Sequence, residues 1–333
     1  MILAGDIGGT KTTFALYEDD ASHSKALCVQ HYHSQEYSHF FAILDHYLQA
    51  VNQDIHVACF SVAGPVFEGH CQTLNLPWLL DADKITQRYH IKKVFLLNDL
   101  QATAYGALVL PEAEKVLLNP DQVDLIGAPP SGNRAVIAPG TGLGEALLYW
   151  DGSKYHPSAS EGGHSDFAPR NALEIALLKF LFEKYAHVSY ERLLSGPGLF
   201  TLYQFMKIHS QGDDDPVLTE RLISEDPAAL ISELALSQSS ACCVKTLDLF
   251  VSILGAEAGN LALKALATGG IYLGGGIVPK ILPKLKDGTF IRAFVEKGRY
   301  SALLSKIPVW LISDPQTALH GAAYYASSKN KRH

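Results

Sequence analysis

Cysteine is scarce in this sequence, and its placement is as informative as its number. The five cysteines are Cys28, Cys59, Cys71, Cys242 and Cys243. Their odd number, and the absence of paired metal-binding spacing, argue against a structural zinc site and a disulfide framework. The pattern is typical of reduced thiols, which predicts a cytoplasmic protein.

Long apolar runs and an excess of positive charge are also missing. No apolar run reaches the roughly 20 residues that a membrane-spanning helix needs, and no basic segment opens the chain as in a signal peptide. We therefore expect no membrane partner. The formal net charge of −7 argues against nucleic acid as the main partner.

The composition that remains is that of a globular protein with a large core. The 333 residues are enough for two domains, and 47% hydrophobic with 18% charged residues is ordinary for a soluble protein. Composition therefore leaves the function open, and the motifs must decide it.

The first motif, residues 6–12, nearly matches a Walker A phosphate loop. Gly5, Lys11 and Thr12 fit that pattern, but Thr10 stands where the second Gly is required. Residues 13–17 are β-branched and aromatic, which predicts a strand and not the helix that follows a Walker A loop. We therefore expect a β-hairpin.

The turn of this hairpin has the chemistry of a phosphate site. Gly8 and Gly9 permit positive φ and let a ligand approach the backbone closely. Asp6 can hold a hydrated metal ion. An ordinary β-hairpin is the alternative. The candidate nucleotide-binding residues here are Asp6, Gly8, Gly9, Thr10, Lys11 and Thr12.

A second glycine-rich turn, residues 139–144, again lies between two predicted strands, 134–138 and 146–150. It is not a dinucleotide fingerprint, because Glu145 breaks the spacing and no helix follows. Two strand–turn–strand units in separate halves predict an internal duplication. The candidates in this turn are Gly140, Thr141 and Gly142.

The periodicity of the rest predicts an α/β protein with mixed sheets. In the first half we expect strands at 2–7, 11–17, 26–33, 55–63 and 94–97, helices at 38–52 and 99–108, and a helix-like crossover before 94. In the second half we expect helices at 171–186, 189–194, 197–209 and 228–267, strands at 270–273 and 309–312, and a final helix at 315–327. The acidic segment 212–216 is expected to be a solvated loop, since its spacing does not match a calcium loop.

Asn98 and Asp99 directly follow the apolar strand 94–97. Ligands of α/β sheets bind beyond the carboxyl ends of strands, so a carboxylate here is well placed as a general base. The alternative is that Asp99 is only the N-cap of the following helix.

Three further segments carry polar or glycine-rich signals. Glu161 and His164, separated by two glycines, can both bind the hydroxyls of a small polar ligand; a zinc site would need more ligands. Glu191 opens a short helix that Ser189 is expected to cap, and a first-turn Glu is also what the helix dipole favours. Gly274, Gly275 and Gly276 follow a buried strand, where either an adenosine or a tightly packed helix would explain them.

Together these motifs resemble the bacterial glucokinase family, the hexokinase-type branch of the actin-like ATPase superfamily. The likeness covers nearly the whole chain in the expected order. The matching segments are 6–12 and 140–144 (phosphate motifs), 98–99 (catalytic Asp), 161–164 and 191–198 (sugar signature), and 273–277 (adenosine motif).

A related repressor and kinase family carries a cysteine-rich zinc motif soon after the equivalent His. No Cys lies between Cys71 and Cys242, so the chain is assigned to the zinc-free branch. No winged-helix segment precedes Asp6, which argues against a DNA-binding repressor.

The resemblance implies a duplicated actin-like ATPase (ribonuclease H-like) fold, with two mixed-sheet α/β domains flanking a cleft. The expected small domain is 1–110 with the C-terminal helix at about 315–328, and the large domain is 111–314. The domains are expected to close on glucose and expel water. A homodimer is also implied, and the 228–267 region would offer it apolar surface.

The activity implied by the resemblance is ATP-dependent phosphorylation of D-glucose at its 6-hydroxyl, feeding glycolysis. Asp99 would accept the hydroxyl proton, while Asn98, Glu161, His164 and Glu191 would hold the ring hydroxyls.

The resemblance also assigns the nucleotide contacts. Gly8, Gly9, Thr10, Thr141 and Gly142 would meet the phosphates. Mg²⁺ would be held mainly by phosphate oxygens and water, with Asp6 in its outer shell. Asp166, Asn75 and Trp78 are further candidates to support the sugar loop.

Two alternatives remain open at this point. The chain could phosphorylate another hexose, such as mannose or fructose, or an N-acetyl amino sugar. It could instead be a non-catalytic actin-like nucleotide switch, although such a switch would not need Asn98, Asp99, Glu161, His164 and Glu191 together.

Overall fold

The computed structural model describes the whole chain except residues 22–24, 74–75, 122, 124–130, 211–215 and 331–333. Asn75 and most of the acidic segment 212–216 lie outside the described residues. The chain divides into two compact units: unit 1 contains Met1–Glu114, Pro157–Ala159 and Asp314–His333, and unit 2 contains Lys115–His156 and Ser160–Ser313. The domain boundaries expected from the sequence stay a prediction.

Unit 1 is built on a five-stranded mixed sheet, in the order β3-β2-β1-β4-β7. Its strands are β1 (Ile2–Ile7), β2 (Lys11–Tyr17), β3 (Leu27–His33), β4 (Val57–Val62) and β7 (Lys93–Asn98). β1 pairs antiparallel with β2 and parallel with β4, which in turn pairs parallel with β7. A separate two-stranded sheet joins β5 (His70–Gln72) to β6 (Leu79–Asp81). The hairpin predicted at 2–17 is confirmed.

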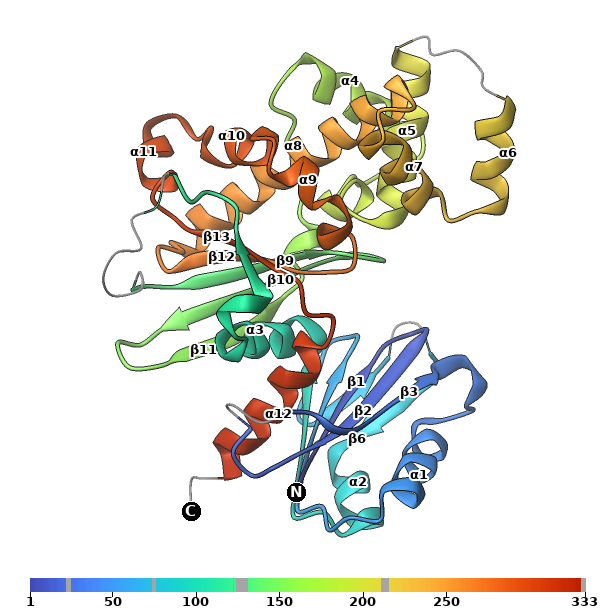
Figure 1. The fold of residues 1–333 in the computed structure, drawn as a ribbon, viewed down its shortest axis with the longest axis vertical. Helices are drawn as coiled ribbons and strands as arrows, with labels where there is room; N and C mark the ends of the chain where they lie inside the picture. Colours follow the sequence, from blue (N-terminus) through green and yellow to red (C-terminus); the bar gives the residue numbers. More distant parts are fainter. Residues whose placement is uncertain (22–24, 74–75, 122, 124–130, 211–215, 331–333) are drawn as a thin grey trace. The chain divides into compact units, whose positions relative to one another are not determined.

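Helices cover both faces of the unit 1 sheet (Figure 1). α1 (Phe40–Val51) and α2 (Ala82–Tyr89) pack on one face, where Phe14 and Phe60 lie in the core with Phe40. α3 (Asp99–Val109) and α12 (Thr317–Asn330) pack on the other, against Ala4, Ala15 and Cys59. The strands are apolar on both faces because both are covered.

Unit 2 contains a six-stranded sheet, in the order β11-β10-β9-β12-β13-β8. Its strands are β8 (Lys115–Leu117), β9 (Arg134–Pro139), β10 (Leu143–Trp150), β11 (Tyr155–Ser160), β12 (Gly270–Leu273) and β13 (Val309–Ile312). β9 pairs antiparallel with β10 and parallel with β12, which pairs parallel with β13.

The two sheets share one topology, so the predicted internal duplication is confirmed. β3-β2-β1-β4-β7 of unit 1 corresponds, strand by strand, to β11-β10-β9-β12-β13 of unit 2. The halves differ in the helices that lie, along the chain, between β3 and β4 of unit 1 and between β11 and β12 of unit 2. Unit 1 has α1 there, whereas unit 2 has α4 (Ala172–Phe182), α5 (Gly196–His209), α6 (Pro216–Ser224), α7 (Pro227–Leu236) and α8 (Ala241–Ala265).

Two helix predictions in unit 2 need correction. The region 228–267 is not continuous, because α7 and α8 meet at a bend of 103°. Gln238 adopts a positive φ of 58° at the break, and Ser240 caps the new helix by accepting from Cys243 N at 3.3 Å. The helix predicted at 189–194 is the short 3-10 turn η4 (Tyr190–Arg192).

The remaining short helices of unit 2 have no strong sequence signal. They are α9 (Leu282–Leu285), α10 (Thr289–Val295) and α11 (Ser301–Leu304). α10 packs along α8, where Gly255 and Gly259 lie against backbone carbonyls of Phe290 and Phe294. These contacts are long-range, and the pattern of any one segment does not reveal them.

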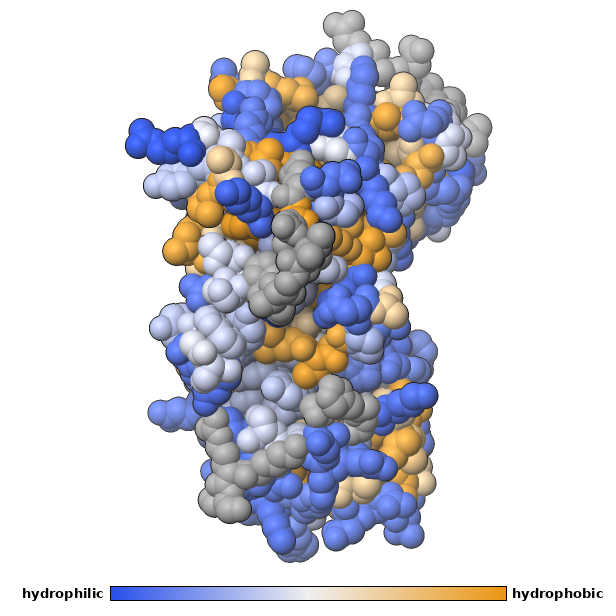
Figure 2. Space-filling view, turned by 60° about the vertical axis from the view of Figure 1, so that its left-hand side comes forward, coloured by the Kyte–Doolittle hydropathy of each residue, from blue (hydrophilic) through white to orange (hydrophobic). Residues whose placement is uncertain are grey.

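The surface drawn in Figure 2 is largely hydrophilic, with apolar side chains in separate groups. Over the described ranges, no single helix is long and apolar enough to cross a membrane. α7 and α8 pass the length and composition test only as a bent pair. Most apolar residues of both helices, such as Leu230, Phe250 and Leu254, lie in the core of unit 2.

The crossing of α3 and α12 predicts a stability effect. A Cβ on Gly321 would overlap the carbonyl oxygen of Ala102, so Gly321→Ala must push the two helices apart. Overpacking of this kind costs about 1–3 kcal/mol, and we expect chemical denaturation to show that loss. Gly276→Ala is the control, because a Cβ there meets no atom within 4 Å. Equal stability of both variants would contradict this account of the crossing.

Candidate active site

The turn of the first hairpin is held by its own backbone and by Ser34. Gly8 N–H donates to Lys11 O at 3.0 Å, and Ser34 Oγ donates to Gly8 O at 2.8 Å. A Cβ on Gly8 would lie 2.9 Å from Lys11 O, so glycine is needed for close approach. Neither Gly8 nor Gly9 has a positive φ. Gly8 therefore serves close packing here and not an unusual backbone conformation.

The candidates in this turn differ in accessibility. Thr10 and Lys11 are exposed, and Gly8 and Gly9 are half-buried. Thr12 is fully buried and its hydroxyl is hydrogen-bonded to Ser34 Oγ at 2.9 Å. The Thr12 side chain thus fastens the hairpin, and the accessible groups are those of residues 8–11.

Asp6 lies one residue before the end of β1, beside this turn. Its Oδ1 accepts from Ser61 Oγ of β4 at 2.9 Å. Burial raises the pKa of the Asp6 carboxyl, while the Ser61 hydrogen bond and the charge of Lys11 oppose that rise. Among the described residues no group of three or more His, Cys, Asp or Glu could hold a metal ion. One fixed carboxylate suits an outer-shell position for Mg²⁺, which is otherwise held by phosphate oxygens and water.

Asn98 and Asp99 lie at the same edge of the unit 1 sheet as the hairpin turn. The register pairs Ile7 with Val62 and Val62 with Asn98, so β1, β4 and β7 end side by side. The sequence prediction that Asp99 follows a strand at its carboxyl end is confirmed. This edge is where ligands bind in α/β sheets.

The N-cap of α3 is Asn98 and not Asp99. Asn98 Oδ1 accepts from Leu100 N at 3.0 Å and Gln101 N at 3.3 Å, and its Nδ2 donates to Gly64 O at 3.2 Å. Asp99 lies in the first helical turn, is half-buried, and accepts from Leu100 N at 2.9 Å. The alternative that Asp99 is merely the cap is therefore wrong.

In unit 2, the second glycine turn is tied directly to the Glu191 segment. Glu191 Oε2 accepts from Leu143 N at 3.0 Å. Gly196 N donates to Gly140 O, and Gly140 N donates to Gly142 O, both at 2.8 Å. A Cβ on Gly142 would lie 2.5 Å from Glu191 Oε2. The turn and this carboxylate thus form one rigid assembly.

Ser195, and not Ser189, supplies the capping hydroxyl in this segment. Ser195 Oγ accepts from Gly198 N at 3.1 Å to cap α5, and it donates to Glu191 O at 2.8 Å. Ser189 precedes η4 without a side-chain capping bond. The expectation for Ser189 is wrong because a 3-10 turn of three residues stands where a longer helix was predicted.

Glu161 directly precedes the 3-10 turn η3 (Gly162–His164), His164 is its last residue, and both are exposed. His164 Nε2 lies 3.8 Å from Glu191 Oε1, so the structure brings these two candidates together. A Cβ on Gly163 would overlap Leu143 O, and one on Gly162 would overlap the carboxylate of Glu145. The two glycines are needed because the turn lies directly on β10.

The Gly274–Gly276 segment packs against the end of β9. Gly274 N donates to Ile137 O at 2.9 Å. Gly275 has a φ of 84°, and a Cβ there would overlap Pro139 O. Tight packing therefore explains Gly275, whereas Gly276 faces open space. This segment and the 140–142 turn follow neighbouring parallel strands at one sheet edge.

The two remaining support candidates have defined surroundings. Asp166 Oδ1 lies 2.8 Å from His187 Nε2, and both side chains are exposed. Trp78 is buried in unit 1, where its Nε1 donates to Tyr37 O at 3.3 Å. Their support of the sugar loop stays a prediction.

One residue near the sugar candidates escaped sequence reasoning. In the sequence, Glu145 was noted only because it excludes a dinucleotide-binding glycine pattern at residues 139–144. In the structure its side chain is 2% exposed and lies under η3. Burial raises the pKa of Glu145 to about 7, the charge of Glu257 adds to the rise, and Lys264 opposes it. A Glu in the middle of an otherwise apolar strand was the available signal.

The duplicated fold, with a glycine turn at one sheet edge of each unit and a His–Glu pair beside the second turn, defines a sugar kinase of the actin-like ATPase fold. Comparison with known proteins agrees. A family model described as Glucokinase matches residues 3–329. The chain belongs to the glucokinase family.

Individual relatives are similar along almost their full length. A glucokinase of Nostoc punctiforme is 39% identical over 98% of this chain and 99% of its own. A glucokinase of Synechocystis is 37% identical over 98% and 97%. The crystal structure of a glucokinase from an Antarctic psychrotroph superposes with a TM-score of 0.84 at 32% identity, covering 98% of both chains.

The contact between Gly142 and Glu191 gives a test of this geometry. Gly142→Ala would displace the Glu191 carboxylate from Leu143 N–H, because the new Cβ would lie 2.5 Å from Oε2. Losing a hydrogen bond to a charged group costs about 1.5–3 kcal/mol, so we expect glucose binding to weaken roughly 10-fold or more. Titration calorimetry with glucose measures this. An unchanged dissociation constant, in a variant with normal thermal stability, would contradict the role given to Gly142.

Proposed function

We propose that this protein transfers the γ-phosphoryl group of ATP to the 6-hydroxyl of D-glucose, forming glucose 6-phosphate. Membership of the glucokinase family supports the reaction. The observation that carries the proposal furthest is the hydrogen bond from Leu143 N to Glu191 Oε2, at 3.0 Å. It joins a candidate sugar ligand to a candidate phosphate turn, as a sugar kinase requires.

Asp99 is the proposed general base. It follows β7 and lies in the first turn of α3, where the N-cap is Asn98 and not Asp99. It would accept the proton of the 6-hydroxyl and align the oxygen with the γ-phosphorus. Phosphoryl transfer passes through a loose transition state, so positioning and charge neutralisation dominate the catalysis.

The ring hydroxyls are assigned to Asn98, Glu161, His164 and Glu191. The carboxylates can accept from hydroxyls, and His164 can donate or accept. Glu191 keeps Oε1 beside His164 while Oε2 is held by Leu143 N, so its orientation is fixed before sugar binds. A site that hydrogen-bonds a hydroxyl rejects analogues that lack it.

The phosphates are assigned to Gly8, Gly9, Thr10 and Lys11 in unit 1 and to Gly140, Thr141 and Gly142 in unit 2. Gly274, Gly275 and Gly276 are assigned to the adenosine. When bound, Mg²⁺ supplies charge neutralisation for the phosphate chain. Asp6 would bind a water of its outer shell.

The proposal extends to the cellular setting. We propose a cytoplasmic homodimer that feeds glycolysis and has neither nucleic acid nor membrane as a partner. The reduced cysteines and the net charge of −7 support this setting. Within the 228–267 region, which was expected to offer apolar surface, most of α8 is buried inside unit 2.

The alternatives differ in substrate or in class. A kinase for mannose, fructose or an N-acetyl amino sugar would use the same constellation, and a nucleotide switch would hydrolyse or bind ATP without a sugar. A coupled assay with Mg-ATP and glucose, mannose or N-acetylglucosamine in parallel separates the sugars. Sedimentation with ATP tests for filaments. Folded, ATP-binding protein that phosphorylates no sugar would overturn the proposed function.

The role of Asp99 predicts a specific loss of rate. Asp99→Asn is expected to fold and bind glucose, but to lose about 10²–10⁴-fold in kcat, since that is what a positioned general base contributes. Asp83→Asn is the matched control, because Asp83 lies in the first turn of α2 and is exposed. An Asp99→Asn enzyme that keeps more than roughly a tenth of the wild-type kcat would exclude Asp99 as the base.

A further inference from the structure

Glu145 is a buried carboxyl group that the proposed mechanism does not use. It lies on β10, opposite Ile137 of β9, and is 2% exposed. Its Oε1 is buried and has no hydrogen-bond partner among the described residues. A buried carboxylate without a partner is costly, so the neutral acid is favoured at this position.

The charged groups that face Glu145 come from α8. Glu257 is fully buried, accepts from Asn260 Nδ2 at 2.8 Å, and lies 3.5 Å from Lys264 Nζ. Lys264 is thus already paired with Glu257, while the Glu257 charge repels a second carboxylate. From η3, the backbone of Gly162 lies against Glu145 Oε2 and brings no charge.

The ionisation state of Glu145 follows from this environment. Burial, then the charge of Glu257, raises its pKa to about 7, against the opposing charge of Lys264. Near neutral pH the group therefore exchanges between a protonated and an ionised form. The protonated form can also donate a hydrogen bond, which the ionised form cannot.

Glu145 is coupled to the sugar candidates through backbone and side-chain contacts. Its carbonyl accepts from Ser160 Oγ at 3.3 Å, and the same Oγ accepts from Gly162 N at 3.2 Å. Two residues earlier, Leu143 supports Gly163 with its carbonyl and holds Glu191 with its N–H. The turn η3 thus packs on the stretch of β10 from Leu143 to Glu145.

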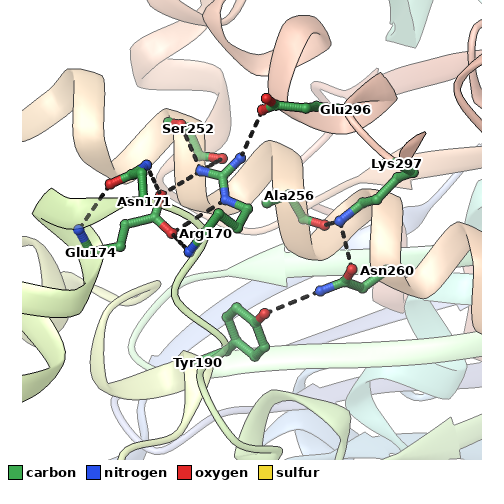
Figure 3. A network of polar contacts seen from close by, with 9 residues as sticks. All are labelled: Arg170, Asn171, Glu174, Tyr190, Ser252, Ala256, Asn260, Glu296 and Lys297. Carbon is green, nitrogen blue, oxygen red and sulfur yellow. Dashed lines mark hydrogen bonds and ion pairs between the residues drawn. The ribbon is translucent and has the colours of Figure 1, made fainter.

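A polar network in unit 2 includes Tyr190, the neighbour of Glu191 in the chain, together with Asn260 and Lys297 (Figure 3). Asn260 Nδ2 donates to Tyr190 OH at 3.1 Å as well as to Glu257, and Lys297 Nζ donates to Asn260 Oδ1 at 2.6 Å. Tyr190 precedes Glu191 in η4. Asn260 thus links Glu257, whose charge acts on Glu145, to Tyr190 of η4, the element that also carries Glu191.

We propose that Glu145 is a positioning residue for glucose, and that its protonated form holds the turn carrying Glu161 and His164 in the binding geometry. Ionisation places a second negative charge beside Glu257 and under Gly162. The turn then moves off β10 to let water reach the carboxylate, and glucose binding weakens. The inference rests on the proposed function, because it concerns the same sugar site.

The inference predicts the pH dependence of glucose affinity. Because the pKa of Glu145 is raised, its protonated form, which we propose favours glucose binding, is fully present below the ordinary carboxyl pKa. This form is lost as pH rises through about 7. If only the protonated form binds, KM for glucose rises about tenfold between pH 6 and pH 8, with a smaller effect on kcat. Glu145→Gln, which mimics the neutral acid, is expected to abolish this rise.

The control must separate Glu145 from other groups that titrate. His164 lies beside Glu191, and any contribution of its imidazole to the pH profile would persist in Glu145→Gln. Glu183→Gln, at the exposed end of α4, should keep the wild-type pH profile. The same rise in Glu145→Gln as in the wild type, or no rise in the wild type, would overturn the inference.

A measurement on the unmodified protein guards against a variant that fails to fold. Glucose binding at pH 7.5 should take up about three-quarters of a proton, and almost none at pH 6, when calorimetry is run in buffers of different ionisation enthalpy. No proton uptake at pH 7.5 would overturn the inference. Absence of glucose turnover at every pH would instead count against the proposed function.

Discussion

The hydrogen bond from Leu143 N–H to the Glu191 carboxylate organises the second half of the site. It fixes one oxygen of Glu191 and leaves the other beside His164. A second hydrogen bond, from Gly196 N at the start of α5 to Gly140 O, also ties the 140–142 turn to the segment that follows η4. A carboxylate oriented before substrate arrives loses little freedom on binding, which is why this contact matters for function.

Close packing, more than unusual backbone conformation, explains several glycines of this protein. Gly142 makes room for Glu191, and Gly163 lies against Leu143 O. Gly321 does the same where α12 crosses α3. In each case an added Cβ would meet backbone or a fixed carboxylate. A larger residue would therefore force the neighbouring elements to shift, at a cost in stability. Gly275, with a φ of 84°, needs glycine for both reasons.

The duplicated topology places the two glycine turns at equivalent positions, because each follows the central strand, β1 or β9. The second candidate segments are not equivalent. Asn98 and Asp99 follow β7, the counterpart of β13, whereas Gly274 to Gly276 follow β12, the counterpart of β4. The helices α4–α8 enter unit 2 after β11. They bring Glu191 through η4, and they bring Glu257 through α8. One half thereby has a buried polar network beside the turn that we propose binds sugar.

The sequence alone determined the two hairpins, the order of the motifs and the family, because strand alternation, glycine turns and apolar periodicity are local. It could not give the break at Gln238 or the capping by Asn98 and Ser195, which depend on single φ angles and hydroxyl directions. Only the tertiary structure decided that Thr12 is buried and that Glu145 lies between η3 and α8. The partner of Thr12 is Ser34, 22 residues away, and the charge that acts on Glu145 is that of Glu257, more than a hundred residues away. No local pattern encodes either contact.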